Sequence, residues 1–527
     1  MSFHVYDTTL RDGAQQEGMN LSLADKLAIA GLLDELGVGF IEGGWPGAIP
    51  KDTEFFKRAG SELQLKNAVL AAFGSTRKAH KATASDPQVK ALLDAETPVV
   101  TLVAKSDIRH VERALKTTGE ENLAMISDTI ELLVKEGRRV VLDAEHFFDG
   151  YRFNREYTTS CVKAAADAGA EVVVLCDTNG GMVPSFIREI VAEIGQQVDV
   201  QLGIHCHNDT GCAVANSLAA VEAGAMHVQG TINGYGERTG NADLTTVVAN
   251  LEIKYGNHVL PNSNLEDLTN IAHSIAEITN IAPFARQPYV GQSAFTHKAG
   301  LHASAIRVDP DLYQHIDPAS VGNDMRMLVS EMAGRASIEL KGKELGIDLT
   351  GEGDVIGRVA DKVKDLEAKG YTFDAADASF ELLLRSELED EPISFYDVES
   401  WRTISETTGT GEGETKSEAT VKLSAGGKRY VATGEGNGPV NALDAAMRLA
   451  LLPVYPELKA IKLVDYKVRI LDSSSGTDAI TRVTIESSDG RRSWRTVGVG
   501  ENVIEASWEA LGGAIAYGLF KMGIARR

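Results

Sequence analysis

The first half of the chain alternates eight short apolar runs with amphipathic segments, and this alternation is what most limits the fold. Each run is rich in Val, Ile, Leu and Ala, as is typical of a strand covered on both faces. Several of the intervening segments, such as 23–36, 122–136, 157–168 and 212–223, open with polar residues, and several close at glycine, as helices do. The predicted strands are 3–8, 40–43, 68–73, 99–104, 140–144, 172–176, 200–205 and 227–231. Eight βα units in about 250 residues predict an α/β fold of the (β/α)8 TIM-barrel type.

Polar side chains stand at or directly after the ends of these predicted strands. In a barrel of parallel strands the carboxyl ends meet at one face, and that face carries the active site. The residues in question are Arg11, Asp12, Glu42, Lys105, Glu145, Asp177, Thr178, Asn179, His205, His207, Glu237 and Arg238.

Two of these residues, His205 and His207, are separated by a single position at the end of an apolar run. Side chains along a strand alternate with a period of two, so both imidazoles project from the same face and can converge on one divalent metal. Asp12 ends the first strand and supplies an oxygen ligand to the same site. This mixed nitrogen and oxygen set favours an open site for Zn²⁺, Mn²⁺ or Mg²⁺ over a closed structural zinc site. Cys206 is expected on the opposite face, as a buried thiol.

Arg11 lies next to a metal ligand and therefore needs an anionic partner. Either it pairs with a neighbouring carboxylate or it stabilises charge that develops on a substrate, and we favour the second. The glycine-rich segment 234–241 allows close backbone approach after the last strand. It lacks the setting of a dinucleotide-binding loop, which argues against a nicotinamide cofactor.

Composition narrows the class of protein further. The chain has 527 residues, 43% of them hydrophobic, and a formal net charge of −23, which argues against nucleic acid or an anionic membrane as a partner. No run approaches the ~18 apolar residues of a membrane span. Four cysteines without the spacing of a zinc knuckle or a disulfide framework predict a cytoplasmic protein.

The remainder of the chain predicts two further parts. Residues 262–395 are expected to be mostly helical. A polar, glycine-rich break at 405–416 lies near the start of a region with strand character, and two of that region's stretches, 419–451 and 480–519, repeat a plan of strands, glycines and a helix. Such a duplication predicts a two-layer α/β domain. The expected domains are a barrel over 1–261, a helical subdomain over 262–395 and a C-terminal domain over 396–527.

Three motifs, in this order, resemble the signatures of the metal-dependent 2-isopropylmalate, homocitrate and citramalate synthase family. They are Asp7-Thr-Thr-Leu-Arg-Asp-Gly13, His205-Cys-His-Asn-Asp209 and Gly234-Tyr-Gly-Glu-Arg-Thr-Gly-Asn241. Within the family, the segments at 14–17, 44–47 and 143–150 are most similar to members that condense pyruvate with acetyl-CoA. The resemblance therefore implies an acyltransferase that uses these two substrates and a divalent metal.

The resemblance also implies roles for individual residues. Asn241 becomes a weaker fourth metal-site ligand or a positioning residue, and Thr178 holds the substrate carboxylate. Glu145 and His302 become the acid and base candidates, with Tyr313 orienting. His302 and Tyr313, in the helical region, are implied to complete the active site of a partner subunit in a homodimer. His302 is preferred to His297, because it follows Gly-Leu as the family's catalytic histidine does.

For the C-terminal domain the resemblance implies inhibition by an end-product amino acid, isoleucine for a pyruvate-specific enzyme in isoleucine biosynthesis. Alternatives remain a 2-isopropylmalate synthase, a carbon-carbon lyase on the same barrel and an inactive effector-binding protein. Aromatic residues near the expected pocket, namely Phe73, Phe147 and Phe148, either narrow it for pyruvate or belong to the core. Coenzyme A is expected near 45–48.

Overall fold

The computed structural model describes residues 3–261, 264–407, 415–471 and 479–526. The chain divides into two compact units, each described by itself below. The first is Met1–Phe295 with Ile316–Asp324, and the second is Thr296–His315 with Met325–Arg527. Within the described ranges no helix combines the length and the hydropathy that crossing a bilayer demands.

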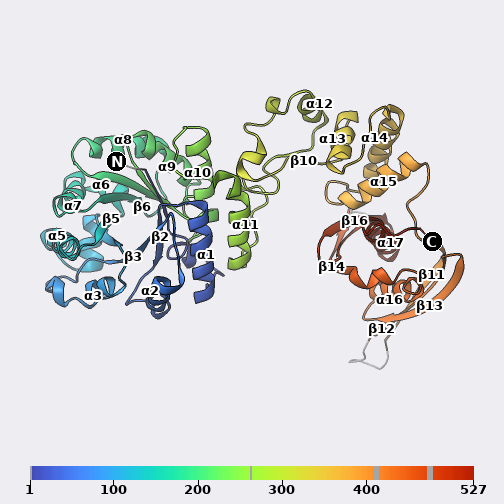
Figure 1. The fold of residues 1–527 in the computed structure, drawn as a ribbon, viewed down its shortest axis with the longest axis horizontal. Helices are drawn as coiled ribbons and strands as arrows, with labels where there is room; N and C mark the ends of the chain where they lie inside the picture. The colour runs from blue at the N-terminus through green and yellow to red at the C-terminus, as the bar shows by residue number, and fades with distance from the viewer. Residues whose placement is uncertain (1–2, 262–263, 408–414, 472–478, 527) are drawn as a thin grey trace. The chain divides into compact units, whose positions relative to one another are not determined.

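The first unit is built on a closed barrel of eight parallel strands, as the alternation predicted (Figure 1). The strands are β1 (His4–Asp7), β2 (Phe40–Gly44), β3 (Val69–Ser75), β4 (Val99–Lys105), β5 (Arg139–Glu145), β6 (Val172–Asp177), β7 (Gln201–Cys206) and β8 (His227–Gly230). The barrel closes where β1 pairs with β8, with His4 opposite His227. All carboxyl ends therefore open at one mouth.

Helices follow the strands and cover the barrel (Figure 1). They are α1 (Leu23–Leu36), α2 (Pro50–Glu62), α3 (Pro87–Asp94), α4 (Ile108–His110), α5 (Gly119–Lys135), α6 (Phe147–Phe153), α7 (Arg155–Asp167), α8 (Pro184–Gly195), α9 (Ala213–Glu222), α10 (Leu244–Ile253) and α11 (Leu268–Thr279). Local sequence sets their ends: α1 starts at a capping box of Ser22 with Asp25 and stops at Gly37, whose φ of 94° suits glycine.

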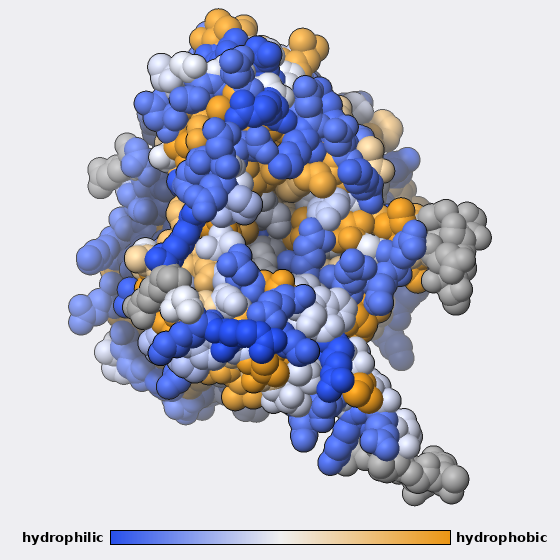
Figure 2. All heavy atoms as spheres, turned by 90° about the vertical axis from the view of Figure 1, so that its right-hand side faces the viewer, coloured by the Kyte–Doolittle hydropathy of each residue, from blue (hydrophilic) through white to orange (hydrophobic). Residues whose placement is uncertain are grey.

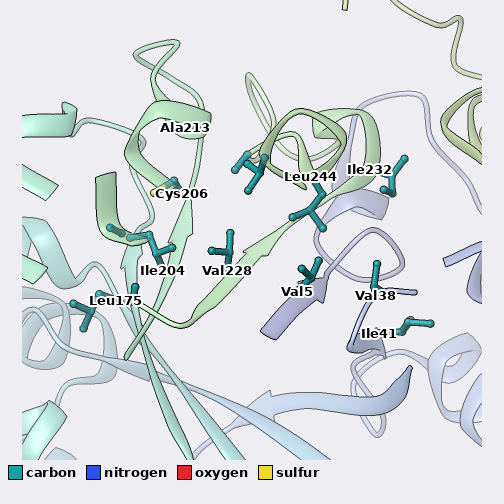
Figure 3. Close-up of a cluster of buried hydrophobic side chains, with 14 of the residues drawn as sticks. Val5, Val38, Ile41, Leu175, Ile204, Cys206, Ala213, Val228, Ile232 and Leu244 are labelled. Atoms are coloured by element: carbon teal, nitrogen blue, oxygen red, sulfur yellow. The ribbon is translucent and has the colours of Figure 1, made fainter. Parts of the chain in front are cut away.

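The main hydrophobic core fills the layer between strands and helices. Figure 3 shows Ile204 and Cys206 of β7 and Val228 of β8 in this layer, with Ala213 of α9 close to Cys206. Cys206 is buried there, on the face predicted for it. Because side chains alternate along a strand, His205 and Gln229 face the interior of the barrel.

The second unit begins with small elements and helices and ends with two antiparallel sheets. Its elements are β9 (Thr296–His297), α12 (Gly300–Val308), β10 (Arg326–Met327), α13 (Arg335–Glu344), α14 (Gly353–Ala368), α15 (Asp377–Glu389), β11 (Asp397–Thr407), β12 (Thr415–Ala425), β13 (Lys428–Gly436), α16 (Pro439–Leu451), β14 (Lys462–Ile470), β15 (Thr481–Ser488), β16 (Ser493–Gly500) and α17 (Val503–Lys521). The sheets have the orders β11-β12-β13 and β14-β15-β16, and one core cluster contains residues of both.

The duplication predicted for this region is confirmed, since each sheet is followed by one long helix. Gly434 of β13 and Gly498 of β16 occupy equivalent places. A Cβ at Gly434 would lie 2.4 Å from the backbone nitrogen of Ala446, and one at Gly498 would lie 2.1 Å from the backbone oxygen of Ala506. In both halves, glycine therefore lets the helix approach its sheet closely.

One detail of that prediction was wrong. Each half has three strands, and the sequence patterns missed the first strand of each, β11 and β14. The expected break at 405–416 overlaps the end of β11 and the start of β12, and its residues 408–414 lie outside the described residues. Both missed strands are largely exposed, so they lack the apolar alternation by which a half-buried strand is recognised.

The surface of the second unit carries apolar side chains among polar ones. Figure 2 shows hydrophobic side chains interrupting a mainly hydrophilic face. Several exposed apolar residues belong to the two edge strands: Val398, Ile404, Leu463, Val464, Val468 and Ile470.

Candidate functional site

A tight turn after β1 places Arg11 and Asp12 at the mouth of the barrel. The carbonyl oxygen of Thr8 accepts hydrogen bonds from three successive amides, those of Arg11, Asp12 and Gly13, at 3.1, 2.9 and 3.0 Å. The neighbouring Asp7 carboxylate accepts from the amide and the hydroxyl of Thr9, both at 2.9 Å. The turn is thus held by two acceptors, the Thr8 carbonyl and the Asp7 carboxylate.

Asp12, His205 and His207 meet in the barrel, as predicted, and offer ligand atoms that all lie within 4.8 Å of one another. The Nε2 atoms of His205 and His207 lie 3.4 and 4.0 Å from Asp12 Oδ2. Asn241 is brought beside them because its backbone bridges to that of His207. Its side-chain oxygen is buried and has no hydrogen-bond partner in the described part of the chain, whereas its nitrogen donates to Tyr235 O at 3.0 Å.

The protonation states of Asp12, His205 and His207 are those that bind a cation. Burial raises the pKa of Asp12, but the charge of Arg11 is the largest of the opposing effects, which together leave this pKa below its usual range. Burial lowers the pKa of His205 to about 4 and also lowers that of His207. The group is therefore a carboxylate with two neutral imidazoles, and with the free oxygen of Asn241 it fits a divalent metal.

Arg11 is held by a buried carboxylate. Its Nε donates to Glu42 Oε2 at 2.6 Å, and its Nη1 lies 3.3 Å from Asp12 Oδ2. The guanidinium carbon lies 3.9 Å from the centre of the Phe73 ring. Tyr6 donates to the other oxygen of Glu42 at 3.0 Å. The pairing with a neighbouring carboxylate, the less favoured of our two hypotheses, is present, and a role toward substrate stays a prediction.

Glu145 and Thr178 stand on the neighbouring side of the mouth. Glu145 forms an ion pair with Lys105, which lies opposite it in the β4–β5 register. The hydroxyl oxygen of Thr178 accepts a hydrogen bond from the amide of His146 at 2.8 Å, and His146 takes the left-handed conformation, with a φ of 59°. The Thr178 hydroxyl hydrogen therefore remains available for donation. Asp177 instead accepts two loop amides.

These side chains line one cavity of about 710 Å³. Its lining includes Arg11, Asp12, Trp45, Phe73, Lys105, Asp143, Glu145, Thr178, His205 and His207. Of the aromatic residues considered from the sequence, Phe73 lines this cavity, whereas Phe147 and Phe148 are fully buried in the main core. Trp45 contributes to the wall, packs edge-on against Phe73 and donates to Gln88 at 2.7 Å.

The remaining predicted residues belong to the second unit. His302 of α12 stacks on Tyr313, with ring centroids 4.1 Å apart. The ring of His297 lies 6.2 Å from that of His302. Burial lowers the pKa of His297, and the neighbouring His302 adds to this effect. The structure therefore brings His302 and Tyr313 together, and their acid-base and orienting roles stay a prediction.

Sequence reasoning missed one inner support of the site, Gln229, which lies between His205 and Asp143 inside the barrel. Glu42 and Lys105 were expected at the mouth, but their pairing with Arg11 and Glu145 was not predicted. A signal for Gln229 existed, because it is a polar residue inside an otherwise buried strand. Such a residue needs a hydrogen-bond partner within the barrel.

Three family models match successive parts of the chain. The HMGL-like model matches residues 2–275, and the homocitrate synthase post-HMGL domain-like model matches residues 289–371. The LeuA allosteric (dimerisation) domain model matches residues 374–519.

Curated relatives match the whole chain. A protein named (R)-citramalate synthase from Streptomyces coelicolor is 64% identical over 99% of this chain and 98% of its own length. One of the same name from Aquifex aeolicus is 50% identical over 98% of each. A 2-isopropylmalate synthase from Methanocaldococcus jannaschii is 32% identical over 96% of this chain and 93% of its own length.

Proposed function

Because this chain belongs to the family of (R)-citramalate synthases, which are acyltransferases with an HMGL-like barrel, we propose that it condenses acetyl-CoA with pyruvate to give (R)-citramalate and CoA. The observation that carries the proposal is the cavity in which Arg11, Thr178 and Glu145 surround the group of Asp12, His205 and His207. It holds a cation, a hydroxyl donor, a carboxylate and metal ligands, which are the groups that a 2-oxo acid condensation uses.

Asp12, His205 and His207 would hold the divalent ion, Zn²⁺, Mn²⁺ or Mg²⁺, with Asn241 as a weaker ligand or as a positioning group. When bound, the ion supplies Lewis-acid polarisation of the pyruvate ketone. Burial favours the neutral form of the imidazoles, as metal binding requires, because a fully protonated imidazole has no free lone pair for a metal.

Thr178 binds the pyruvate carboxylate through its hydroxyl hydrogen. The hydroxyl oxygen already accepts from the His146 amide, and its hydrogen is left for donation to the carboxylate. Arg11 stays protonated: burial lowers its pKa, but Glu42 and Asp12 raise it further. Its guanidinium stabilises the alkoxide that develops when the ketone carbon is attacked.

The condensation breaks a methyl C–H bond of acetyl-CoA. That electron pair forms the new bond to the ketone carbon, and the ketone π pair moves onto its oxygen. Glu145 of one copy and His302 of the other copy in the homodimer move the protons, with Lys105 fixing the Glu145 carboxylate and Tyr313 orienting His302 by stacking. Water then cleaves the thioester of citramalyl-CoA, which releases CoA as a thiol and makes the overall reaction effectively irreversible.

The C-terminal region supplies assembly and control in this proposal. We divide the chain into a catalytic barrel over 1–261, a helical subdomain over 262–395 that contributes His302 and Tyr313, and a regulatory domain over 396–527. The match to a LeuA allosteric (dimerisation) domain and the exposed apolar residues of β11 and β14 support a homodimer. Isoleucine is the effector we propose, in a cytoplasmic enzyme whose four cysteines are free thiols.

The test is CoA thiol release by the purified protein with Mn²⁺ and acetyl-CoA. Pyruvate, 2-oxobutanoate, 2-oxoisovalerate and 2-oxoglutarate are compared by kcat/KM. We expect pyruvate to be preferred and isoleucine to inhibit. A preference for 2-oxoisovalerate would replace the proposal by a 2-isopropylmalate synthase, and no thiol release with any of the acids would overturn it.

A further inference from the structure

A buried glutamine links the candidate metal site to a carboxyl group on the far side of the barrel interior. Gln229 of β8 is fully buried, and its Oε1 lies 3.0 Å from His205 Nδ1. Its Nε2 donates to Asp143 Oδ1 of β5 at 2.9 Å. In Figure 3 the neighbouring Val228 lies in the strand–helix layer, so Gln229 faces inward like His205.

This geometry permits one arrangement of protons. An amide oxygen only accepts, so the Nδ1 of His205 must be the protonated nitrogen of the ring. The lone pair then lies on Nε2, the atom 3.4 Å from Asp12 Oδ2. With the amide reversed, an NH₂ group would face Nδ1 and the ring proton would move to Nε2, where it would block ligation.

The contact with Asp143 agrees with this orientation of the amide. Asp143 Oδ1 accepts from the glutamine nitrogen, which leaves the glutamine oxygen facing His205. The second histidine has no such support: His207 Nδ1 is buried and has no hydrogen-bond partner among the residues that the structure describes. Of the two imidazoles, His205 is thus the one whose ring is fixed by a side chain.

We propose that Gln229, held by Asp143, is a positioning residue for the divalent cation: it fixes the tautomer and the ring orientation of His205. The inference rests on the metal site of the proposed function and adds to it two residues, Gln229 and Asp143, that are not themselves among the proposed ligands. Partners of this kind, behind a ligating histidine, contribute about 10–100-fold to metal affinity.

The first test measures Mn²⁺ affinity of the full-length protein without substrates, from the EPR signal of unbound Mn²⁺. Gln229→Leu keeps a side chain of similar size but removes both hydrogen bonds. We expect its Kd for Mn²⁺ to rise about 10–100-fold. Gln201→Leu is the matched control: Gln201 also contacts a histidine, His4, at 3.2 Å, but at the opposite end of the barrel. Its Kd should equal that of the unaltered protein.

The second test exchanges the amide and the carboxyl. In Gln229→Glu combined with Asp143→Asn, the asparagine amide donates to the glutamate, which still accepts from His205. We expect the double variant to bind Mn²⁺ more tightly than either single variant. This comparison decides the matter if Gln229→Leu does not fold, because a merely structural role gives no such rescue.

The outcomes separate the inference from the proposed function. An unaltered protein that binds no Mn²⁺ would overturn the metal site and the inference with it. Tight binding by the unaltered protein with an equal Kd in Gln229→Leu, or a double variant no better than both single variants, would overturn the role of Gln229 alone.

Discussion

The Arg11 guanidinium donates from Nε to Glu42 Oε2 across 2.6 Å, and the carboxylate that receives it is fully buried. Tyr6 donates to the other oxygen of the same carboxylate. Because Nε carries this bond, the outer nitrogens of the guanidinium are left for Asp12 and for the cavity. Glu42 therefore acts as the support that aims Arg11.

Replacing Arg11 by lysine should lower kcat for condensation about 100-fold or more, or about 2.7 kcal/mol in transition-state stabilisation. A lysine ammonium is one compact charge and cannot donate to Glu42 while also presenting a planar fork to the developing alkoxide. Steady-state kinetics with pyruvate and acetyl-CoA measure the effect. Arg139→Lys is the control, since Arg139 pairs with Glu171 at the other end of β5. An Arg11 variant with unchanged kcat would remove this residue from the mechanism.

Thr178→Val should raise KM for pyruvate about 10-fold with a smaller change in kcat, because it removes one hydrogen bond to a charged group, about 1.4 kcal/mol. Thr178→Ser keeps the hydroxyl and should retain KM. Both values come from initial rates at saturating acetyl-CoA. An equal KM in the valine and serine variants would show that Thr178 does not hold the carboxylate.

Gly434→Ala and Gly498→Ala should each destabilise the second unit by about 1–3 kcal/mol, because the added methyl group meets helix backbone. Calorimetry should show a lower denaturation temperature for both. The control is Gly353→Ala at the start of α14, where a Cβ meets nothing within 4 Å. Similar losses in all three variants would contradict the close approach of helix and sheet.

His227 should make the barrel sensitive to acid. Burial lowers its pKa well below the ordinary 6.5, and His4 adds to the effect. As the pH falls, His227 is therefore protonated in the unfolded chain before it is protonated in the folded protein. His227 therefore leaves the free energy of unfolding almost unchanged above about pH 7 and lowers it below pH 6.5, by up to about 1.4 kcal/mol per pH unit.

The measurement is the denaturation temperature of the metal-free protein between pH 7 and pH 5, compared with His227→Gln. Buried carboxyls with raised pKa values, such as Asp7 at about 7, oppose the trend in both proteins, so the difference between them isolates His227. Parallel pH curves would show that His227 does not resist protonation.

The sequence predicts that Asp12, His205 and His207 come together, and two simple regularities explain this success. A period of two puts His205 and His207 on one face, and parallel strands bring their ends to the same mouth as Asp12. The boundaries of the eight barrel strands follow equally from apolar runs. The same logic fails for β11 and β14, since a strand exposed on both faces leaves no apolar pattern to detect.

Partnerships across the barrel cannot be predicted in this way. Gln229 and Asp143 are separated by 86 positions, and their contact depends on which interior residues reach the same layer of the barrel. That depends on the register of every intervening strand. A polar residue in a buried strand indicates that a hydrogen-bond partner exists, but the identity of that partner comes only from the three-dimensional structure.

The turn in which one carbonyl, that of Thr8, receives the amides of Arg11, Asp12 and Gly13 has a consequence for redesign of the enzyme. Arg11 and Asp12, the proposed substrate-binding cation and the proposed metal ligand, are held by the same turn, so neither can be moved without displacing the other. Attempts to admit larger 2-oxo acids should leave this turn intact. They should enlarge the wall at Met125 of α5, which lines the cavity from a helix and belongs neither to this turn nor to the group of Asp12, His205 and His207.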